Sequence, residues 1–195
     1  MSAETAPDTT PAAALDEAAN AAPSAPETAV FCVGNRLMLD DGVGPATYDY
    51  LLEHYRFPPQ VDLFDVGCMS MDMISKVEHY DLLISVDAVD GTPDEPGTVY
   101  RYEPRDIART DGPMSSLHEL KLADLFDAAE LLGHSADGMC FGMRVFNMAP
   151  VEFAVGLTPD VEARVPFFAE CVVAELVRRG HEVRRADGTL VTPES

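Results

Sequence analysis

The sequence predicts an α/β fold: a three-layer, doubly wound, mostly parallel sheet of about five strands with helices on both faces. Two observations support this prediction. Short apolar runs alternate along the chain with segments whose apolar residues recur at the helical period, as expected when crossover helices join parallel strands. The run DLLISVDAV, residues 81–89, is apolar almost throughout, which is typical of a strand buried on both faces.

Five segments have the composition of strands. Residues 29–34, 81–89 and 138–146 are expected to be buried strands, whereas residues 98–103 alternate polar and apolar side chains and are expected to form an edge strand. In chain order the segments are AVFCVG (29–34), VDLFDVG (61–67), DLLISVDAV (81–89), TVYRYE (98–103) and GMCFGMRVF (138–146).

Four segments are predicted to be helices, and two carry recognisable start signals. Ser116 and Glu119 form a capping box, and Thr158 is predicted to cap the last helix, which Pro166 could kink. The four segments are PATYDYLLEHY (45–55), SMDMISKVEHY (70–80), SSLHELKLADLFDAAELLG (115–133) and TPDVEARVPFFAECVVAELVRRG (158–180).

A single folded domain is predicted over residues 29–185. Residues 1–28 are rich in Ala, Pro and Thr and contain no Lys or Arg, which predicts a disordered acidic tail rather than a secretion signal with a basic start. Residues 186–195 are predicted to be a disordered C-terminal tail. An apolar fraction of 47% in 195 residues is enough for one full core.

The chain is strongly acidic, with a net charge of -21 and a pI near 4.3. Nucleic acid and anionic membranes are therefore not expected as partners, since phosphate contacts need clustered Lys and Arg. No stretch approaches the roughly 18 consecutive apolar residues that cross a bilayer. Four scattered cysteines without a C-x-x-C pair favour a reducing, cytoplasmic location. A monomer is expected.

Polar residues follow three predicted strands and begin one predicted helix. In an open doubly wound sheet, ligands bind beyond the carboxyl ends of the strands, so these residues could converge on one crevice. Asp87 is the strongest candidate, because a lone charge ending LLISV needs a reason to be there. The candidates are Asn35, Asp40, Asp41, Asp65, Asp87 and His118.

Two carboxylates and one imidazole form a ligand set that suits nickel, zinc, manganese or ferrous iron. An ordinary structural interpretation stands beside this one: a strand-end Asp often forms a turn or caps a helix, and a His near a helix start is often a capping or surface residue. A dinucleotide loop is disfavoured, because only Gly34 directly follows the first strand and two carboxylates come before the next glycine. Asp40 and Asp41 would repel a phosphate and attract a cation.

The chain resembles the maturation endopeptidases of nickel–iron hydrogenases. The resemblance begins at CVGNRLMLDDGVGP, residues 32–45, which is similar to the family's strand, Gly-Asn, acidic pair and G-x-G signature. It extends over most of the predicted domain through four further segments: FDVG, DLLISVDAV, HELKLADLF and the stretch from FGMRV to GLTPDVEA.

This resemblance implies an endopeptidase that removes the C-terminal extension of a hydrogenase large-subunit precursor once nickel has been inserted. It also implies that Asp41, Asp87 and His118 contact the nickel, which the substrate supplies. The metal could polarise the scissile carbonyl or activate a water, or Asp41 could act as a general base. Asn35 and Asp40 are expected to support the loop, and Asp65 could be either a supporting residue or a ligand.

Two features depart from the family pattern. Val66 and Cys68 stand where the family usually has Gly and Thr or Ser, and Cys68 is interpreted either as a small substitute or as a soft group near the nickel path. The acidic N-terminal tail is also outside the pattern. A non-catalytic protein that docks on the precursor without cutting it is the alternative to the protease.

Overall fold

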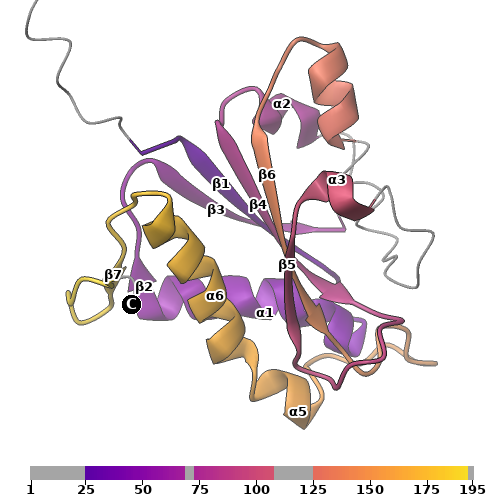
Figure 1. The fold of residues 1–195 in the computed structure, drawn as a ribbon. Coiled ribbons are helices and arrows are strands. Elements are labelled where there is room, and N and C mark those ends of the chain that lie inside the picture. Colours follow the sequence, from indigo (N-terminus) through magenta and orange to yellow (C-terminus); the bar gives the residue numbers. More distant parts are fainter. Residues whose placement is uncertain (1–24, 69–72, 108–124, 193–195) are drawn as a thin grey trace, which may run out of the picture.

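The computed structural model describes residues 25–68, 73–107 and 125–192. Five strands form one sheet in the order β3-β1-β4-β6-β5 (Figure 1). All neighbouring pairs are parallel except β5 with β6, which is antiparallel. The predicted fold class and the edge position of residues 98–103 are confirmed. The strands are β1 (Thr28–Val33), β3 (Val61–Gly67), β4 (Leu82–Val89), β5 (Val99–Tyr102) and β6 (Asp137–Arg144).

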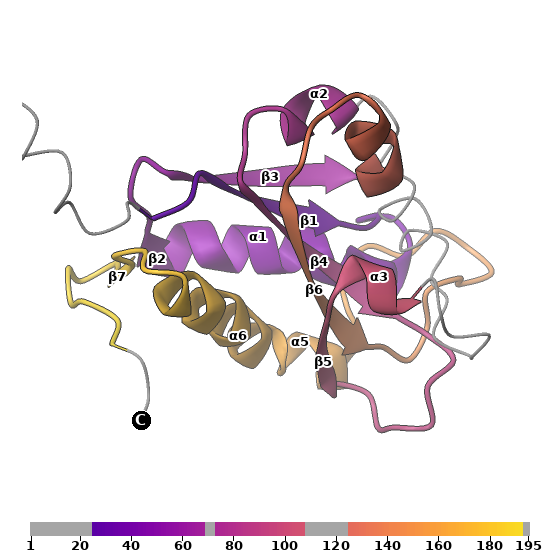
Figure 2. The same cartoon turned by 45° about the horizontal axis from the view of Figure 1, so that its top comes forward.

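Helices cover both faces of this sheet, as Figure 2 shows: α1 and α6 lie on one face, and α2 lies on the other with the helix at residues 125–131. None of the described helices is long and apolar enough to cross a membrane. The helices are η1 (Leu39–Gly42), α1 (Val43–His54), α2 (Ile74–Val77), α3 (Pro104–Ile107), α5 (Pro159–Glu162), α6 (Val165–Arg178) and residues 125–131.

The side chains of each central strand alternate between two apolar cores. Val30 of β1 and Ile84 of β4 pack with Phe168 of α6. Their neighbours Phe31 and Leu83 face the opposite side and pack with Leu125. This alternation follows from the two-residue period of a strand, and it explains why β4 reads as a continuous apolar run.

The prediction of a single helix over residues 158–180 is wrong in one respect, because the structure contains two helices there. α5 ends at Glu162 and α6 begins at Val165. Pro166 lies in the first turn of α6, where its missing N–H leaves no helical hydrogen bond unmade. Pro166 therefore fits a helix start and does not kink a continuous helix.

Two other predicted helices are only partly visible. The helix predicted over residues 70–80 is reduced to α2, Ile74–Val77, within the described part of that segment. The helix predicted over residues 115–133 is described from residue 125 to residue 131. The capping box of Ser116 and Glu119 lies outside the described residues.

The chain beyond α6 forms a small hairpin. β7 (Arg184–Arg185) pairs with β2 (Tyr55–Arg56), and Arg184 also bridges to Leu190. The N–H of Val191 donates to the carbonyl of Val183 at 2.9 Å. Residues 186–192, placed in a disordered tail by the sequence, are thus hydrogen-bonded back onto the domain.

Three arginines surround one buried carboxylate at the end of α6. Glu175 is 4% exposed and accepts hydrogen bonds from Arg101 of β5, Arg178 and Arg179. Burial alone would raise the pKa of Glu175, but the three arginines outweigh it and lower the pKa to about 2. Glu175 therefore ties α6 to the antiparallel edge strand.

This pKa predicts an acid-dependent loss of stability. The stabilisation from Glu175 is complete above the unfolded-state pKa of 4.5 and is lost as pH falls toward 2. The loss amounts to at most about 3 kcal/mol. Urea unfolding of Glu175→Gln should show a lower free energy of unfolding at neutral pH and a shallower decline in acid. Glu170→Gln, an exposed change on the same helix, is the control. An unchanged decline in Glu175→Gln would contradict this account.

Candidate active site at the carboxyl ends of β1 and β4

β1 leaves the sheet through Gly34, whose φ of 139° lies in a region that residues with side chains rarely adopt. A Cβ built on Gly34 would lie 1.9 Å from the carbonyl oxygen of Asp41. Glycine is required here because the chain turns sharply and because the backbone of Asp41 comes so close.

Asn35 closes the loop that follows Gly34. Its N–H donates to the carbonyl oxygen of Asp41 at 3.2 Å and to Asp41 Oδ2 at 3.0 Å. Its own side-chain Oδ1 accepts the N–H of Leu37 at 3.0 Å. These contacts are those of a residue that shapes the loop, and they fix the Asp41 carboxylate relative to the end of β1.

Asp40 is fully buried and joins this loop to the segment that follows β6. Its Oδ2 accepts the N–H groups of Phe146 and Asn147, at 3.2 and 3.1 Å. Thr158 donates its N–H to Oδ1 at 2.7 Å and its hydroxyl to Oδ2 at 3.0 Å. Thr158 occupies the predicted N-cap position of α5, but its side chain makes no cap hydrogen bond and donates to Asp40 instead. Asp40 is thus a clamp between distant segments.

Asp41 of η1 and Asp87 of β4 both lie at the carboxyl end of the parallel strands. η1 turns the chain into α1, and a Cβ on Gly44 would meet the carbonyl oxygens of Val33 and Val86 at 2.0 and 2.7 Å. The start of α1 therefore presses on the ends of β1 and β4, one residue before Asp87. Asp41 is 6% exposed and Asp87 is 3% exposed. Two nearly buried carboxylates at one edge favour a cationic ligand over a phosphate.

Asp65, at the end of β3, makes an ion pair that the sequence did not suggest. Arg36 donates to Asp65 Oδ2 from Nε at 3.0 Å, and it also binds Asp49 of α1 at 2.6 Å. Asp65 Oδ1 accepts the N–H of Gly67 at 3.2 Å. Arg36 thus links the loop after β1 to α1 and β3. The hydrogen bonds of Asp65 are those of a supporting residue.

His118 lies outside the described residues, so the structure does not place it relative to Asp41 and Asp87. Within the described part of the chain, no group of three or more His, Cys, Asp or Glu residues is arranged to hold a metal. The site built from described residues therefore consists of two carboxylates and the loop that positions one of them.

The four cysteines carry no disulfide. Cys32 and Cys140 are buried and Cys171 is half-buried, which confirms them as small core residues. Burial raises the pKa of the Cys32 thiol, which keeps it protonated and unreactive. Cys68 is exposed just beyond β3.

The fold occurs in a known class of peptidase. The chain is similar to the solved structure of the hydrogenase maturating endopeptidase HybD from Escherichia coli, with a TM-score of 0.72 and 28% identity. That similarity covers 83% of this chain and 98% of HybD. The fold is accordingly that of an α/β endopeptidase.

Sequence comparison gives the family. A family model described as hydrogenase maturation protease matches residues 45–175. The chain is 30% identical over 173 residues to the hydrogenase expression/formation protein HupD of Thiocapsa roseopersicina, covering 86% of this chain and 76% of HupD. It is 29% identical over 154 residues to the hydrogenase 2 maturation protease of Escherichia coli K12, covering 78% of this chain and 92% of that enzyme. The chain belongs to the hydrogenase maturation protease family, and it is a peptide-bond hydrolase.

Proposed function

We propose that this endopeptidase removes the C-terminal extension of a nickel-loaded large-subunit precursor of a nickel–iron hydrogenase. In this proposal the nickel arrives on the precursor, and Asp41, Asp87 and His118 contact it. Membership of the maturation protease family supports the reaction. The observation that supports the site is that Asp41 of η1 and Asp87 of β4 are both nearly buried, where the start of α1 meets the ends of β1 and β4.

The two carboxylates fit a nickel ion chemically. Asp and Glu oxygens together with imidazole suit nickel, and a cation between Asp41 and Asp87 offsets the cost of holding two negative charges out of water. In peptide hydrolysis a water attacks the scissile carbonyl, and its proton passes to a base while the leaving amine takes up a proton. Either the nickel activates this water and polarises the carbonyl, or Asp41 accepts the proton as general base.

The cellular setting follows from the same features. Free cysteines fit a reducing compartment, and we place the enzyme in the cytoplasm. The net charge of -21 disfavours self-association as well as contact with nucleic acid, so we propose that a single copy acts on the precursor.

The test is a mass measurement on purified components. Incubation with the nickel-loaded precursor should shorten the precursor by its C-terminal extension, and a nickel-free precursor should stay at full mass. The nickel-free sample controls for metal-independent proteolysis. A nickel-loaded precursor that forms a complex yet keeps its full mass would overturn the proposal and indicate a binding protein.

A further inference from the structure

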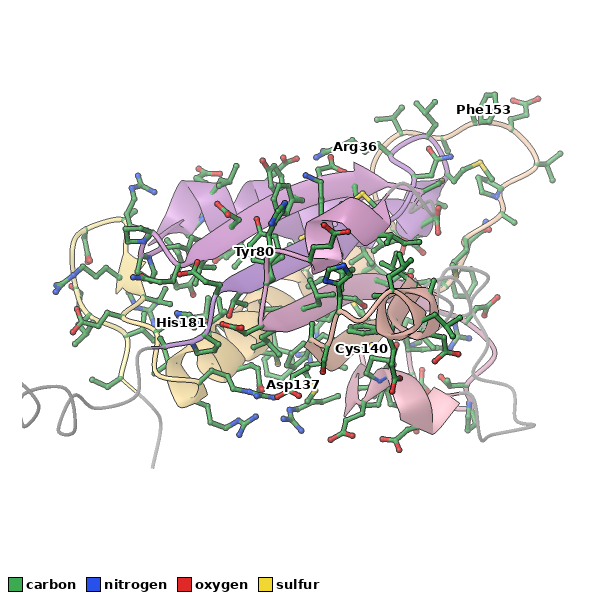
Figure 3. The ribbon with its side chains drawn as sticks, turned by 90° about the horizontal axis from the view of Figure 1, so that it is seen from above. Arg36, Tyr80, Asp137, Cys140, Phe153 and His181 are labelled. Carbon is green, nitrogen blue, oxygen red and sulfur yellow. The ribbon has the colours of Figure 1, made fainter. Side chains whose placement is uncertain are left out.

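The segment between β6 and α5 exposes several large apolar side chains beside the candidate site. Val151 is fully exposed, and Phe146, Phe153 and Val155 are 72%, 80% and 79% exposed. We call residues 146–155 the apolar loop. Figure 3 shows Phe153 near the end of a projecting loop, with Arg36 on the neighbouring segment. Leaving such side chains in water is unfavourable, and a concentration of them marks an interaction surface.

The apolar loop is fixed relative to Asp41. The N–H of Leu39 donates to the carbonyl of Ala154 at 2.8 Å, and the N–H of Ala154 donates to the carbonyl of Leu37 at 3.0 Å. The N–H groups of Phe146 and Asn147 are held by Asp40, the residue before Asp41. A chain bound on the loop is thereby held at a set position relative to the cleavage site.

Charge indicates what the loop would bind. Residues 145–163 contain three acids, Glu152, Asp160 and Glu162, and no Lys, Arg or His. Arg36 on the neighbouring segment is already paired with Asp49 and Asp65. An apolar segment whose own charged residues are all acidic suits a partner that carries apolar side chains flanked by Lys or Arg. A second copy of this chain fits poorly, because each copy has a net charge of -21.

We infer that the apolar loop is the docking surface for the protein substrate, and that it binds an apolar segment of the precursor flanked by basic residues. The inference rests on the proposed function for the identity of the substrate. Its physical basis is the continuity between the loop and the site: an endopeptidase must hold the substrate chain on both sides of the scissile bond, and the loop is hydrogen-bonded to the segment that carries Asp41.

The test compares two double variants. Val151→Gln with Phe153→Gln removes apolar surface from the loop. Leu131→Gln with Leu132→Gln is the matched control, because these leucines are also exposed, at 89% and 61%. They come before β6 and the apolar loop comes after it, so the two sites lie at opposite ends of that strand. The probe is the purified nickel-loaded large-subunit precursor. We expect the loop variant to raise KM by about tenfold or more with kcat within about twofold of wild type, and the control to change neither.

Binding is measured separately from cleavage, so that the two proposals can fail independently. In an Asp41→Asn background, the loop substitutions should weaken precursor affinity by about the same factor, and added salt should weaken it further. Affinity and KM equal to those of the control would overturn the inference even where wild-type protein cleaves. Loop-dependent binding without cleavage would uphold the inference and overturn the protease proposal. A dimer that the loop substitutions dissociate would also overturn it.

Discussion

Asp41→Asn should nearly abolish processing of the precursor while leaving the protein folded. Asn matches Asp in shape and keeps an oxygen that can accept the N–H of Asn35, so the loop should keep its conformation. It lacks the negative charge that, in the proposed function, either contacts nickel or accepts a proton. We expect the processing rate to fall by about 10²- to 10⁴-fold, the usual range for losing such a group. The rate is followed by the mass of the precursor, and folding by circular dichroism.

The control for Asp41→Asn is Asp90→Asn, which removes a carboxylate just after β4 whose side chain is 63% exposed. This variant should process the precursor at close to the wild-type rate. If Asp41→Asn also retained the wild-type rate, Asp41 would be neither a nickel contact nor a general base, and the candidate site would have to be relocated.

Asp40→Ala should have the largest effect on stability near the site. The substitution removes the acceptor of four hydrogen bonds in a fully buried position, including three from backbone N–H groups. Hydrogen bonds to a charged group contribute about 1.5–3 kcal/mol each but do not add, so we expect a total loss of about 3–4 kcal/mol. Urea unfolding measures this loss. Processing should fall too, because the loop that carries Asp41 loses its attachment to the β6–α5 segment.

Two milder variants separate the causes of this effect. Thr158→Ala removes only the hydroxyl bond to Asp40 and should cost about 1 kcal/mol. Asp40→Asn keeps the volume but places an amide group among N–H donors, and it should cost more than Thr158→Ala. Equal stability of Asp40→Ala and wild type would show that water replaces these hydrogen bonds. The interpretation that Asp40 holds the loop after β1 to the β6–α5 segment would then be wrong.

The sequence predicted the strands and the site region because both depend on local patterns. Apolar runs such as DLLISVDAV mark strands through the period of their side chains, and the carboxyl ends of parallel strands meet at one edge. The sequence therefore predicts that Asp41 and Asp87 lie at the same end of the strands, and the structure brings the start of α1, just after Asp41, onto the ends of β1 and β4. The family resemblance is confirmed as well.

Other features depend on residues that are far apart in the sequence. Arg36 joins Asp49 and Asp65 across three elements, and nothing in its local sequence signals this. The pairing of Glu175 with Arg178 and Arg179 follows helical spacing, but its third partner, Arg101, comes from β5. The helix start predicted at Thr158 is confirmed, but the donation of its hydroxyl to Asp40, a carboxylate 118 positions away, has no local signal.

Asp40 and Asp41 show most directly what the sequence determines and what the tertiary structure determines. The sequence by itself determined the fold class, the family and the acidic pair after the first strand, because these rest on composition, periodicity and motif. The family resemblance implied that Asp40 supports the loop and Asp41 contacts the metal, but it offered no physical reason for the difference. The tertiary structure supplies one, because Asp40 meets donors 106 to 118 positions away whereas Asp41 is held by Asn35, only six positions away. Contacts between distant segments exist only once the chain has folded, so no local pattern encodes them.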